Sequence, residues 1–163
     1  MLKDEINKIK ARDSQIKIQE SSTSSSQFPF SEMIKTLKHT FPDEFPAVTK
    51  ISKRENSDPF LVLVSTLLSL RTKDETTEIA MERLTKVAKT PEDILKITDE
   101  KLQELIYPVG FYRNKTKTIK NTAKIIIENY GGKVPDSIDE LLKIKGIGRK
   151  TANLVVTEGF GKP

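Results

Sequence analysis

The chain of 163 residues contains no cysteine and only one histidine, His39. Without cysteine it has no disulfide, no thiolate metal site and no cysteine nucleophile of its own. A single histidine supplies too few ligands for a metal site built from histidines. Apolar runs of bilayer-spanning length are also absent, so we expect no membrane segment. What remains is a composition of 36% hydrophobic and 31% charged residues, which indicates a soluble, globular protein.

Basic charge is concentrated in the last third of the chain. The formal net charge is +5, but residues 1–100 hold 16 Lys and Arg against 17 Asp and Glu, whereas residues 101–163 hold 12 against 6. A localised basic face favours a polyanionic partner, nucleic acid first. An ordinary solvated helix surface has a similar composition, so charge alone leaves both interpretations open.

The chain divides at about residue 28. Residues 1–27 are polar, end in a serine-rich cluster and have little to bury, so we expect a disordered tail. Residues 28–163 should form the folded domain. No alternating strand pattern of useful length occurs there, which predicts an all-α fold, a compact bundle of short helices.

Local signals place the helices of this bundle. Asp58-Pro59 pairs a capping carboxylate with proline at the first helical position, and the apolar run that follows predicts a buried central helix, with a strand as the rival interpretation. Ser137 with Glu140 predicts a capping box. Helices are expected at 31–39, from 59, at 74–88, from 91, at 98–106, at 112–130, after 137 and from 149.

The segment 112–130 has the cleanest helical period. Five residues fall on one face at i, i+3, i+4, i+7 and i+11, namely Ile119, Thr122, Ala123, Ile126 and Tyr130. Gly131-Gly132 should end this helix.

The stretch "IKGIGRK", residues 144–150, predicts a tight reversal between two short helices. Glycine supplies positive φ and close backbone approach, while Ile144 and Ile147 can pack inward. Amides of the turn and of the following first turn then lack helical acceptors, and exposed donors at a positive dipole end can hold an anion. This spacing, with small Ala152 following, is the helix-hairpin-helix pattern and predicts a phosphate clamp. The alternative is a glycine-rich turn without a ligand.

Lys150 lies where the helix dipole opposes a cation, and neighbouring Arg149 repels it further. Both effects favour the neutral amine, which is a nucleophile able to form a Schiff base with a sugar carbon. Lys150 could instead contact a phosphate, whose charge cancels the penalty. The motif alone leaves both roles open.

Three further stretches extend the pattern beyond the hairpin. Together with "LLKIKGIGRKTANLVV", the stretches "DPFLVLVSTLLSLRTKDETT", "LIYPVGFYRNKTKTIKNTAKII" and "GGKVPDSIDELLKIKGIGRKTAN" resemble the endonuclease III family of DNA glycosylase/AP lyases, in the helix-hairpin-helix glycosylase superfamily. The resemblance covers the chain from about Phe30 onward. It implies a six-helix domain with a DNA-binding groove and a role in base excision repair, in which oxidised pyrimidines are excised and abasic sites are cleaved by β-elimination.

The resemblance also implies roles for particular residues. Lys150 falls on the family's catalytic lysine, which favours the Schiff-base nucleophile over the phosphate contact. Arg71, Val109 and Phe111 fall where the family inserts wedges into the duplex, although many members have glutamine in place of Arg71. The implied DNA contacts at the hairpin are Lys145, in place of a usual proline, and Gly146, Ile147, Gly148, Arg149 and Thr151.

Two features of the family have no counterpart in these residues. Its catalytic aspartate follows the hairpin's second helix, and its four cysteines, which bind a [4Fe–4S] cluster, lie near the C-terminus. We therefore expect a chain truncated at its C-terminal end, with no cofactor of its own and a cluster in the full-length protein.

The expected partner is double-stranded DNA containing oxidised pyrimidines or abasic sites, bound by a monomer away from membranes. The expected location is inside the cell with genomic DNA, in the cytoplasm or nucleoid of a prokaryote or the nucleus or mitochondrion of a eukaryote. Two alternatives stay open: a non-catalytic helix-hairpin-helix DNA-binding module and a plain helical interaction domain.

Overall fold

The structure is a computed structural model that describes residues 29–40 and 46–162. The chain divides into two compact units, Met1–Asp43 and Glu44–Pro163. The described helix of the first unit is α2 (Phe30–Thr40), where the sequence predicts one. The predicted disordered tail, residues 1–27, lies outside the described residues.

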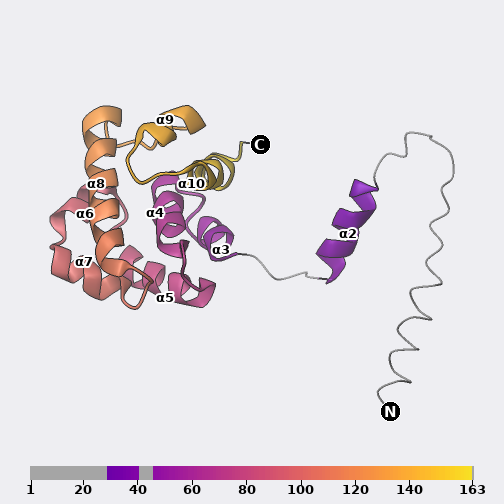
Figure 1. Cartoon of the computed structure of the whole chain (residues 1–163), viewed down its shortest axis with the longest axis horizontal. Coiled ribbons are helices and arrows are strands. Elements are labelled where there is room, and N and C mark those ends of the chain that lie inside the picture. The colour runs from indigo at the N-terminus through magenta and orange to yellow at the C-terminus, as the bar shows by residue number, and fades with distance from the viewer. Residues whose placement is uncertain (1–28, 41–45, 163) are drawn as a thin grey trace, which may run out of the picture. The chain divides into compact units, whose positions relative to one another are not determined.

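The second unit is built from short helices joined by brief loops (Figure 1). The part of the chain that the structure describes contains no strand, which confirms the all-α prediction. The elements are α3 (Ala47–Arg54), α4 (Pro59–Ser69), α5 (Asp74–Thr85), α6 (Pro91–Lys96), α7 (Asp99–Ile106), α8 (Tyr112–Tyr130), α9 (Ile138–Lys143), α10 (Arg149–Leu154) and the π-helical turn η1 (Val155–Gly159). No described helix is both long and apolar enough to cross a membrane.

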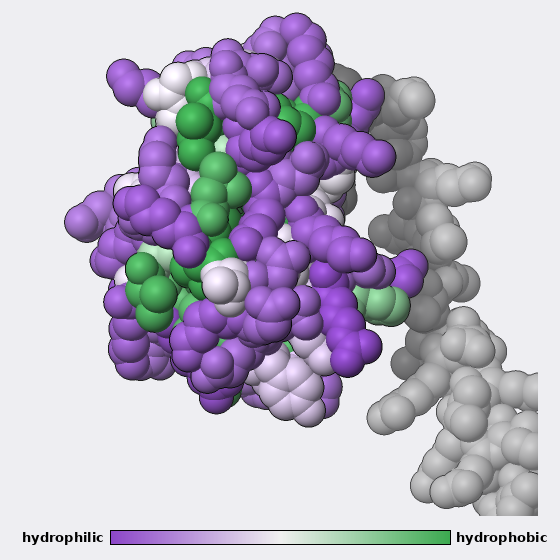
Figure 2. Space-filling model, turned by 90° about the vertical axis from the view of Figure 1, so that its left-hand side faces the viewer, coloured by the Kyte–Doolittle hydropathy of each residue, from purple (hydrophilic) through white to green (hydrophobic). Residues whose placement is uncertain are grey.

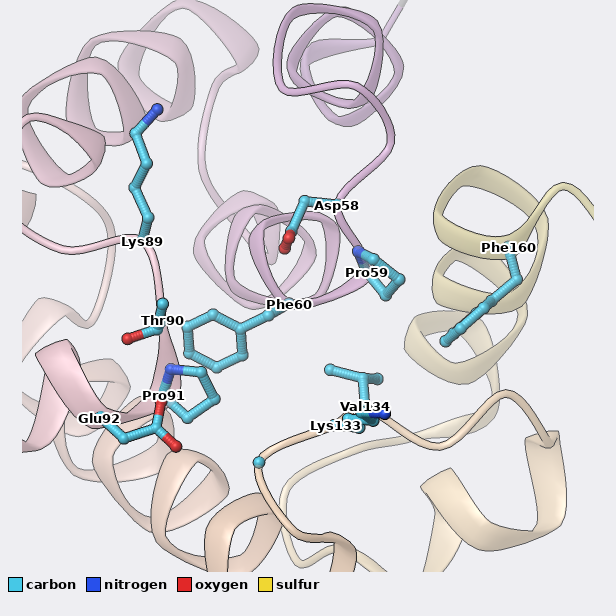
Figure 3. Close-up of a pocket in the computed structure, with 11 residues that line it drawn as sticks. Asp58, Pro59, Phe60, Lys89, Thr90, Pro91, Glu92, Lys133, Val134 and Phe160 are labelled. Atoms are coloured by element: carbon cyan, nitrogen blue, oxygen red, sulfur yellow. The ribbon is translucent and has the colours of Figure 1, made fainter.

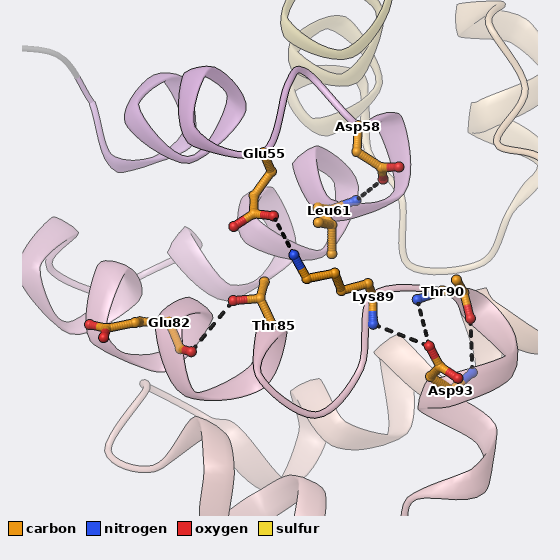
Figure 4. Close-up of polar contacts among 8 residues, drawn as sticks. All are labelled: Glu55, Asp58, Leu61, Glu82, Thr85, Lys89, Thr90 and Asp93. Carbon is orange, nitrogen blue, oxygen red and sulfur yellow. Dashed lines mark hydrogen bonds and ion pairs between the residues drawn. The ribbon is translucent and has the colours of Figure 1, made fainter.

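Helix α4 is the centre of this unit. Asp58 caps it, because Asp58 Oδ1 accepts a hydrogen bond from the Leu61 N–H at 2.9 Å (Figure 4). Pro59 is its first residue. Every residue from Phe60 to Leu68 is buried. The helix contacts α3, α5, α8, α10 and η1, so it needs no polar face. The helix prediction is confirmed, and the rival strand interpretation is wrong.

The loop between α5 and α6 is fixed by polar contacts. Thr90 Oγ1 accepts from the Asp93 N–H at 3.2 Å, and the Asp93 carboxylate accepts from the Thr90 N–H at 3.3 Å, which completes a capping box for α6 (Figure 4). Lys89 Nζ donates to Glu55 Oε2 at 3.1 Å, so the same loop is also tied to the end of α3. These contacts fix the position of the first turn of α6 relative to the rest of the second unit.

Helix α8 has the predicted bounds and the predicted face. Four of the five residues on that face are buried, and Tyr130 is half-buried. Gly131 ends the helix at φ +60, and the Gly132 N–H donates to Ile126 O at 3.0 Å, as in a glycine C-cap.

Two local predictions differ from the structure, and one feature of the last helix was not predicted. Helix α5 ends at Thr85 rather than residue 88, because the chain turns there and the N–H groups of Val87 and Ala88 both donate to Leu84 O. The capping box predicted at Ser137 is wrong: the Ser137 side chain makes no cap bond. Glu140 instead accepts from the Tyr130 hydroxyl at 3.2 Å. The last helix changes from α to π winding at Val155.

Candidate functional site

The hairpin predicted from the sequence is present between α9 and α10. Ile144 and Ile147 are 1% and 6% exposed, and the Ile147 N–H donates to Ile144 O at 3.1 Å across the turn. Their inward packing joins the two helices and confirms the predicted reversal. Because Ile147 faces the core and its N–H is already bonded, it supports the hairpin and offers no free donor to a ligand.

The two glycines of the hairpin serve different needs. Gly146 has φ +100, and a Cβ there would lie 2.8 Å from Thr118 Cγ2 on α8, so the fold itself requires glycine. Gly148 has φ −99, and a Cβ there would meet no described atom within 4 Å. Positive φ was thus predicted correctly for one of the pair. At Gly148 the lack of a side chain instead leaves the backbone uncovered at the surface.

Unpaired donors gather at the start of α10. The N–H groups of Arg149, Lys150 and Thr151 have no acceptor among residues 29–40 and 46–162, whereas the Ala152 N–H donates to Gly148 O at 2.9 Å. Thr151 as a whole is only 2% exposed, so its side chain is not available to a ligand. The hairpin therefore presents backbone donors rather than polar side chains.

Cations surround these donors. Lys145, Arg149 and Lys150 are all exposed. Within the described part of the chain, none of the three makes a hydrogen bond or ion pair through its side chain. The site combines free backbone donors with uncompensated positive charge, an arrangement suited to binding an anion.

The predicted wedge residues lie in two neighbouring loops. Arg71 follows α4 and Phe111 precedes α8, both are exposed, and the Arg71 guanidinium lies 5.9 Å from the centroid of the Phe111 ring. Val109 differs from both, because its side chain is 1% exposed and belongs to the core. The structure thus brings Arg71 and Phe111 together at the surface and places Val109 beneath them.

Helix α8 links the wedge loops to the hairpin. Phe111 lies directly before its first residue, and Thr118, two turns on, is the residue that meets Gly146. Phe111 and Thr118 are about 10 Å apart along the axis at the usual helical rise. The two halves of the candidate site are therefore held on one rigid element.

Sequence reasoning missed Lys115, which is 9% exposed on α8. Its ammonium donates to Leu68 O at 2.7 Å, Leu70 O at 2.6 Å and Thr72 Oγ1 at 3.0 Å. Burial lowers the pKa of Lys115 to about 8, so at neutral pH most of the population still carries three N–H donors. A signal was available: residue 115 stands one turn before Ile119 on the face predicted to be buried.

A cavity of about 410 Å³ opens elsewhere on the second unit, between the starts of α4 and α6 and the Gly132–Val134 loop (Figure 3). Phe60, Pro91, Val134 and Phe160 give it an apolar lining. None of the predicted site residues lines it. Figure 2 shows that the face on the side of α6, α7 and α8 is mostly hydrophilic, with a narrow apolar band.

The chain does not supply ligands for an iron–sulfur cluster. It contains no cysteine, and residues 29–40 and 46–162 hold no group of three or more His, Asp or Glu placed to bind a metal ion. The cluster expected from the resemblance therefore has no site among these residues.

The glycine hairpin between α9 and α10, within an all-helical unit, has the arrangement of a helix-hairpin-helix motif. The family model described as "HhH-GPD superfamily base excision DNA repair protein" matches residues 64–160, more than half of the chain. The chain therefore belongs to the HhH-GPD superfamily of base excision DNA repair proteins.

Its relatives confirm the resemblance to endonuclease III. Endonuclease III of Thermotoga maritima is 46% identical over 131 residues, which are 80% of this chain and 59% of the relative. That of Bacillus subtilis is 45% identical over 108 residues, 66% of this chain and 49% of the relative. The structure of a non-covalent endonuclease III–DNA complex is 32% identical with a TM-score of 0.70, covering 83% of this chain and 60% of that one. The chain spans less than two thirds of each.

Proposed function

We propose that this chain carries the DNA-binding hairpin and the nucleophilic lysine of a bifunctional DNA glycosylase of base excision repair. The proposed substrates are oxidised pyrimidines and abasic sites in double-stranded DNA. The observation that carries the proposal is an exposed Lys150 whose side chain has no partner in residues 29–40 and 46–162, set beside backbone donors at the hairpin that lack acceptors there too. The names of the relatives and the DNA-bound neighbour support the same activity.

The hairpin would bind the DNA backbone rather than read its sequence. Donors of Arg149, Lys150 and Thr151 can reach a phosphate only if nothing stands between them and the duplex. The bare backbone at Gly148 provides that close approach, because any Cβ there would point into open space where the phosphate would lie. Lys145 and Arg149 add charge, and also a dependence on salt concentration.

The proposed chemistry belongs to Lys150. At an abasic site its amine, once it has given a proton to water, attacks C1′ of the open sugar, water leaves, and an iminium ion forms. Loss of a C2′ proton to water then allows the C3′–O bond to break, and the strand is cut with the phosphate as leaving group. At a damaged nucleoside in the whole protein, the same attack on C1′ would displace the base.

The wedge loops would make the sugar accessible. A base must leave the stack before an amine can reach its C1′ carbon, and a damaged base costs less to unpair. Phe111 can fill the resulting gap, and Arg71 can hydrogen-bond the orphaned base opposite. Val109 would support this segment from within the core, in keeping with its burial.

The proposed setting follows from the substrate. The protein would act as a monomer on genomic DNA inside the cell, in the cytoplasm or nucleoid of a prokaryote or the nucleus or mitochondrion of a eukaryote. No step proposed for these residues passes through a metal cluster.

Borohydride trapping tests the proposal. The chain is mixed with a duplex carrying one abasic site, and reduction should convert the Schiff base into a stable protein–DNA adduct. We expect Lys150→Gln to abolish the adduct, because glutamine has no nucleophilic amine. The matched control is Lys145→Gln, which removes a neighbouring exposed cation and should lower the adduct yield only in proportion to weaker DNA binding.

Two results would count against the lysine chemistry. One is an adduct of normal yield with Lys150→Gln. The other is duplex binding without any adduct, which would favour the non-catalytic DNA-binding module. Absence of salt-sensitive duplex binding altogether would favour the plain helical interaction domain.

A further inference from the structure

Both exposed wedge residues occupy positions where glycine costs less. Arg71, φ +54, is the third residue of the turn closed by the Thr72 N–H to Ser69 O bond at 3.1 Å. Phe111, φ +58, is the third residue of the turn closed by the Tyr112 N–H to Val109 O bond at 3.1 Å. Side chains at positive φ are strained by about 1 kcal/mol or more, so something else must hold these turns.

The two turns lie directly against each other. The Gly110 N–H donates to Thr72 Oγ1 at 3.2 Å. A Cβ on Gly110 would lie 2.7 Å from Arg71 O, so the backbones touch where a side chain would force them apart. The position of Phe111 therefore depends on the position of Arg71, although 40 residues separate them in the chain.

The ammonium of Lys115 holds the two turns together through hydrogen bonds. Its three ammonium hydrogens meet three acceptors: the carbonyls of Leu68 and Leu70, and Thr72 Oγ1. The two carbonyls lie at the C-terminal end of α4, where helical acceptors lack partners. Thr72 Oγ1 receives both Lys115 and Gly110, so one hydroxyl joins the lysine and both turns. A compact ammonium serves three converging acceptors better than the planar fork of arginine.

We propose that Lys115 is a positioning residue that locks the Arg71 and Phe111 turns into the shape needed to enter the duplex. This inference rests on the proposed function, and it concerns entry into the stack rather than bond cleavage. Without the ammonium, Leu68 O loses its charged donor, Leu70 O keeps only the long 3.4 Å bond from the Thr72 hydroxyl, and the strained turns are free to relax. The two side chains would then meet DNA singly instead of as one wedge.

The experiment measures wedge entry without chemistry. A duplex carries a tetrahydrofuran abasic analogue with 2-aminopurine opposite it, and the fluorescence rise of this base on saturation with protein reports its unstacking. We expect Lys115→Met to lower the equilibrium constant for unstacking in the bound complex, obtained from this rise, about tenfold, as expected for loss of a charge-assisted hydrogen bond. Its affinity for a single strand carrying the same analogue should change less than about twofold, because a single strand has no stack to enter.

Two companion variants make the result specific. Thr72→Val keeps the side-chain shape but removes the shared hydroxyl, so it should reproduce the loss even if Lys115→Met is poorly folded. Lys120→Met removes another lysine of α8, which pairs with Asp99 at 2.6 Å, and should leave the fluorescence rise unchanged.

The outcomes separate this inference from the proposed function. Full unstacking by Lys115→Met and Thr72→Val overturns the positioning role. The role is also overturned if both variants lose single-strand affinity and melting temperature together with unstacking. That pattern would mean that Lys115 and Thr72 stabilise the whole fold rather than the wedge turns. Failure of the unaltered chain to bind the duplex at all rejects the proposed function itself.

Discussion

At the scale of single residues, Phe111 carries a large exposed side chain at a backbone conformation that disfavours it. The residue is 60% exposed at φ +58, so its ring contributes little to the core while its backbone is strained. We predict that Phe111→Gly is more stable than Phe111→Ala by about 1 kcal/mol, since glycine alone relieves a positive φ. Urea denaturation of the two variants measures the difference.

The same pair separates stability from function. Both variants lose the ring, so both should lose unstacking of the base opposite the lesion to the same degree, whatever their stabilities. Equal stability of Phe111→Gly and Phe111→Ala would contradict the left-handed conformation. Normal unstacking by either variant would show that the Phe111 ring is not part of the wedge.

At this scale the sequence predicts which side chains are buried by local spacing, but not contacts between residues far apart in the chain. The exposure of Lys150 and the burial of Ile144 and Ile147 followed from the hairpin pattern, because local spacing decides which side chains face inward. The role of Lys115 did not follow, since its acceptors lie more than 40 residues earlier in the chain. Only the packing of α8 against the end of α4 brings them together.

At the scale of elements, α4 connects the core to the wedge. Its N-terminus is held by the Asp58 cap, and its C-terminus offers the carbonyls that Lys115 binds. We predict that Asp58→Ala lowers the free energy of unfolding by about 1 kcal/mol, because the Leu61 N–H loses its acceptor. Asp58→Asn should retain most of that stability, since an amide oxygen can also cap. Thermal unfolding checks both variants.

A cap defect should not spread along the helix. The buried residues from Phe60 to Leu68 hold α4 by packing, so loss of one terminal bond leaves its far end in place. We therefore expect Asp58→Ala to unstack 2-aminopurine normally at temperatures where it is folded. Loss of unstacking without loss of stability would instead show that Asp58 acts on the wedge residues directly.

Elements with two independent signals were predicted correctly. Helix α4 had a cap and an unbroken apolar run, and α8 had a period and a glycine stop. The capping box at Ser137 rested on spacing alone, and Glu140 bonds the Tyr130 hydroxyl instead. Likewise the π turn at Val155 has no sequence signal that we recognise.

At the scale of the whole molecule, the location of charge should matter more than its total. Lys145 and Arg149 stand at the hairpin without partners among the described residues, whereas Lys86, at the end of α5, and Lys101 on α7 each pair with a glutamate three or four residues away in sequence. All four are exposed, and replacing either pair by glutamine changes the net charge by the same amount.

We therefore predict different salt responses from these two double variants. The slope of log affinity for duplex DNA against log salt concentration should fall in magnitude by about 2 for Lys145→Gln with Arg149→Gln, one unit for each lost phosphate contact. The slope should not change for Lys86→Gln with Lys101→Gln, although overall attraction weakens slightly. Fluorescence anisotropy over a salt series measures both. Equal slopes for the two double variants would mean that the duplex responds to the charge of the whole surface. The hairpin would then not be the phosphate-binding site.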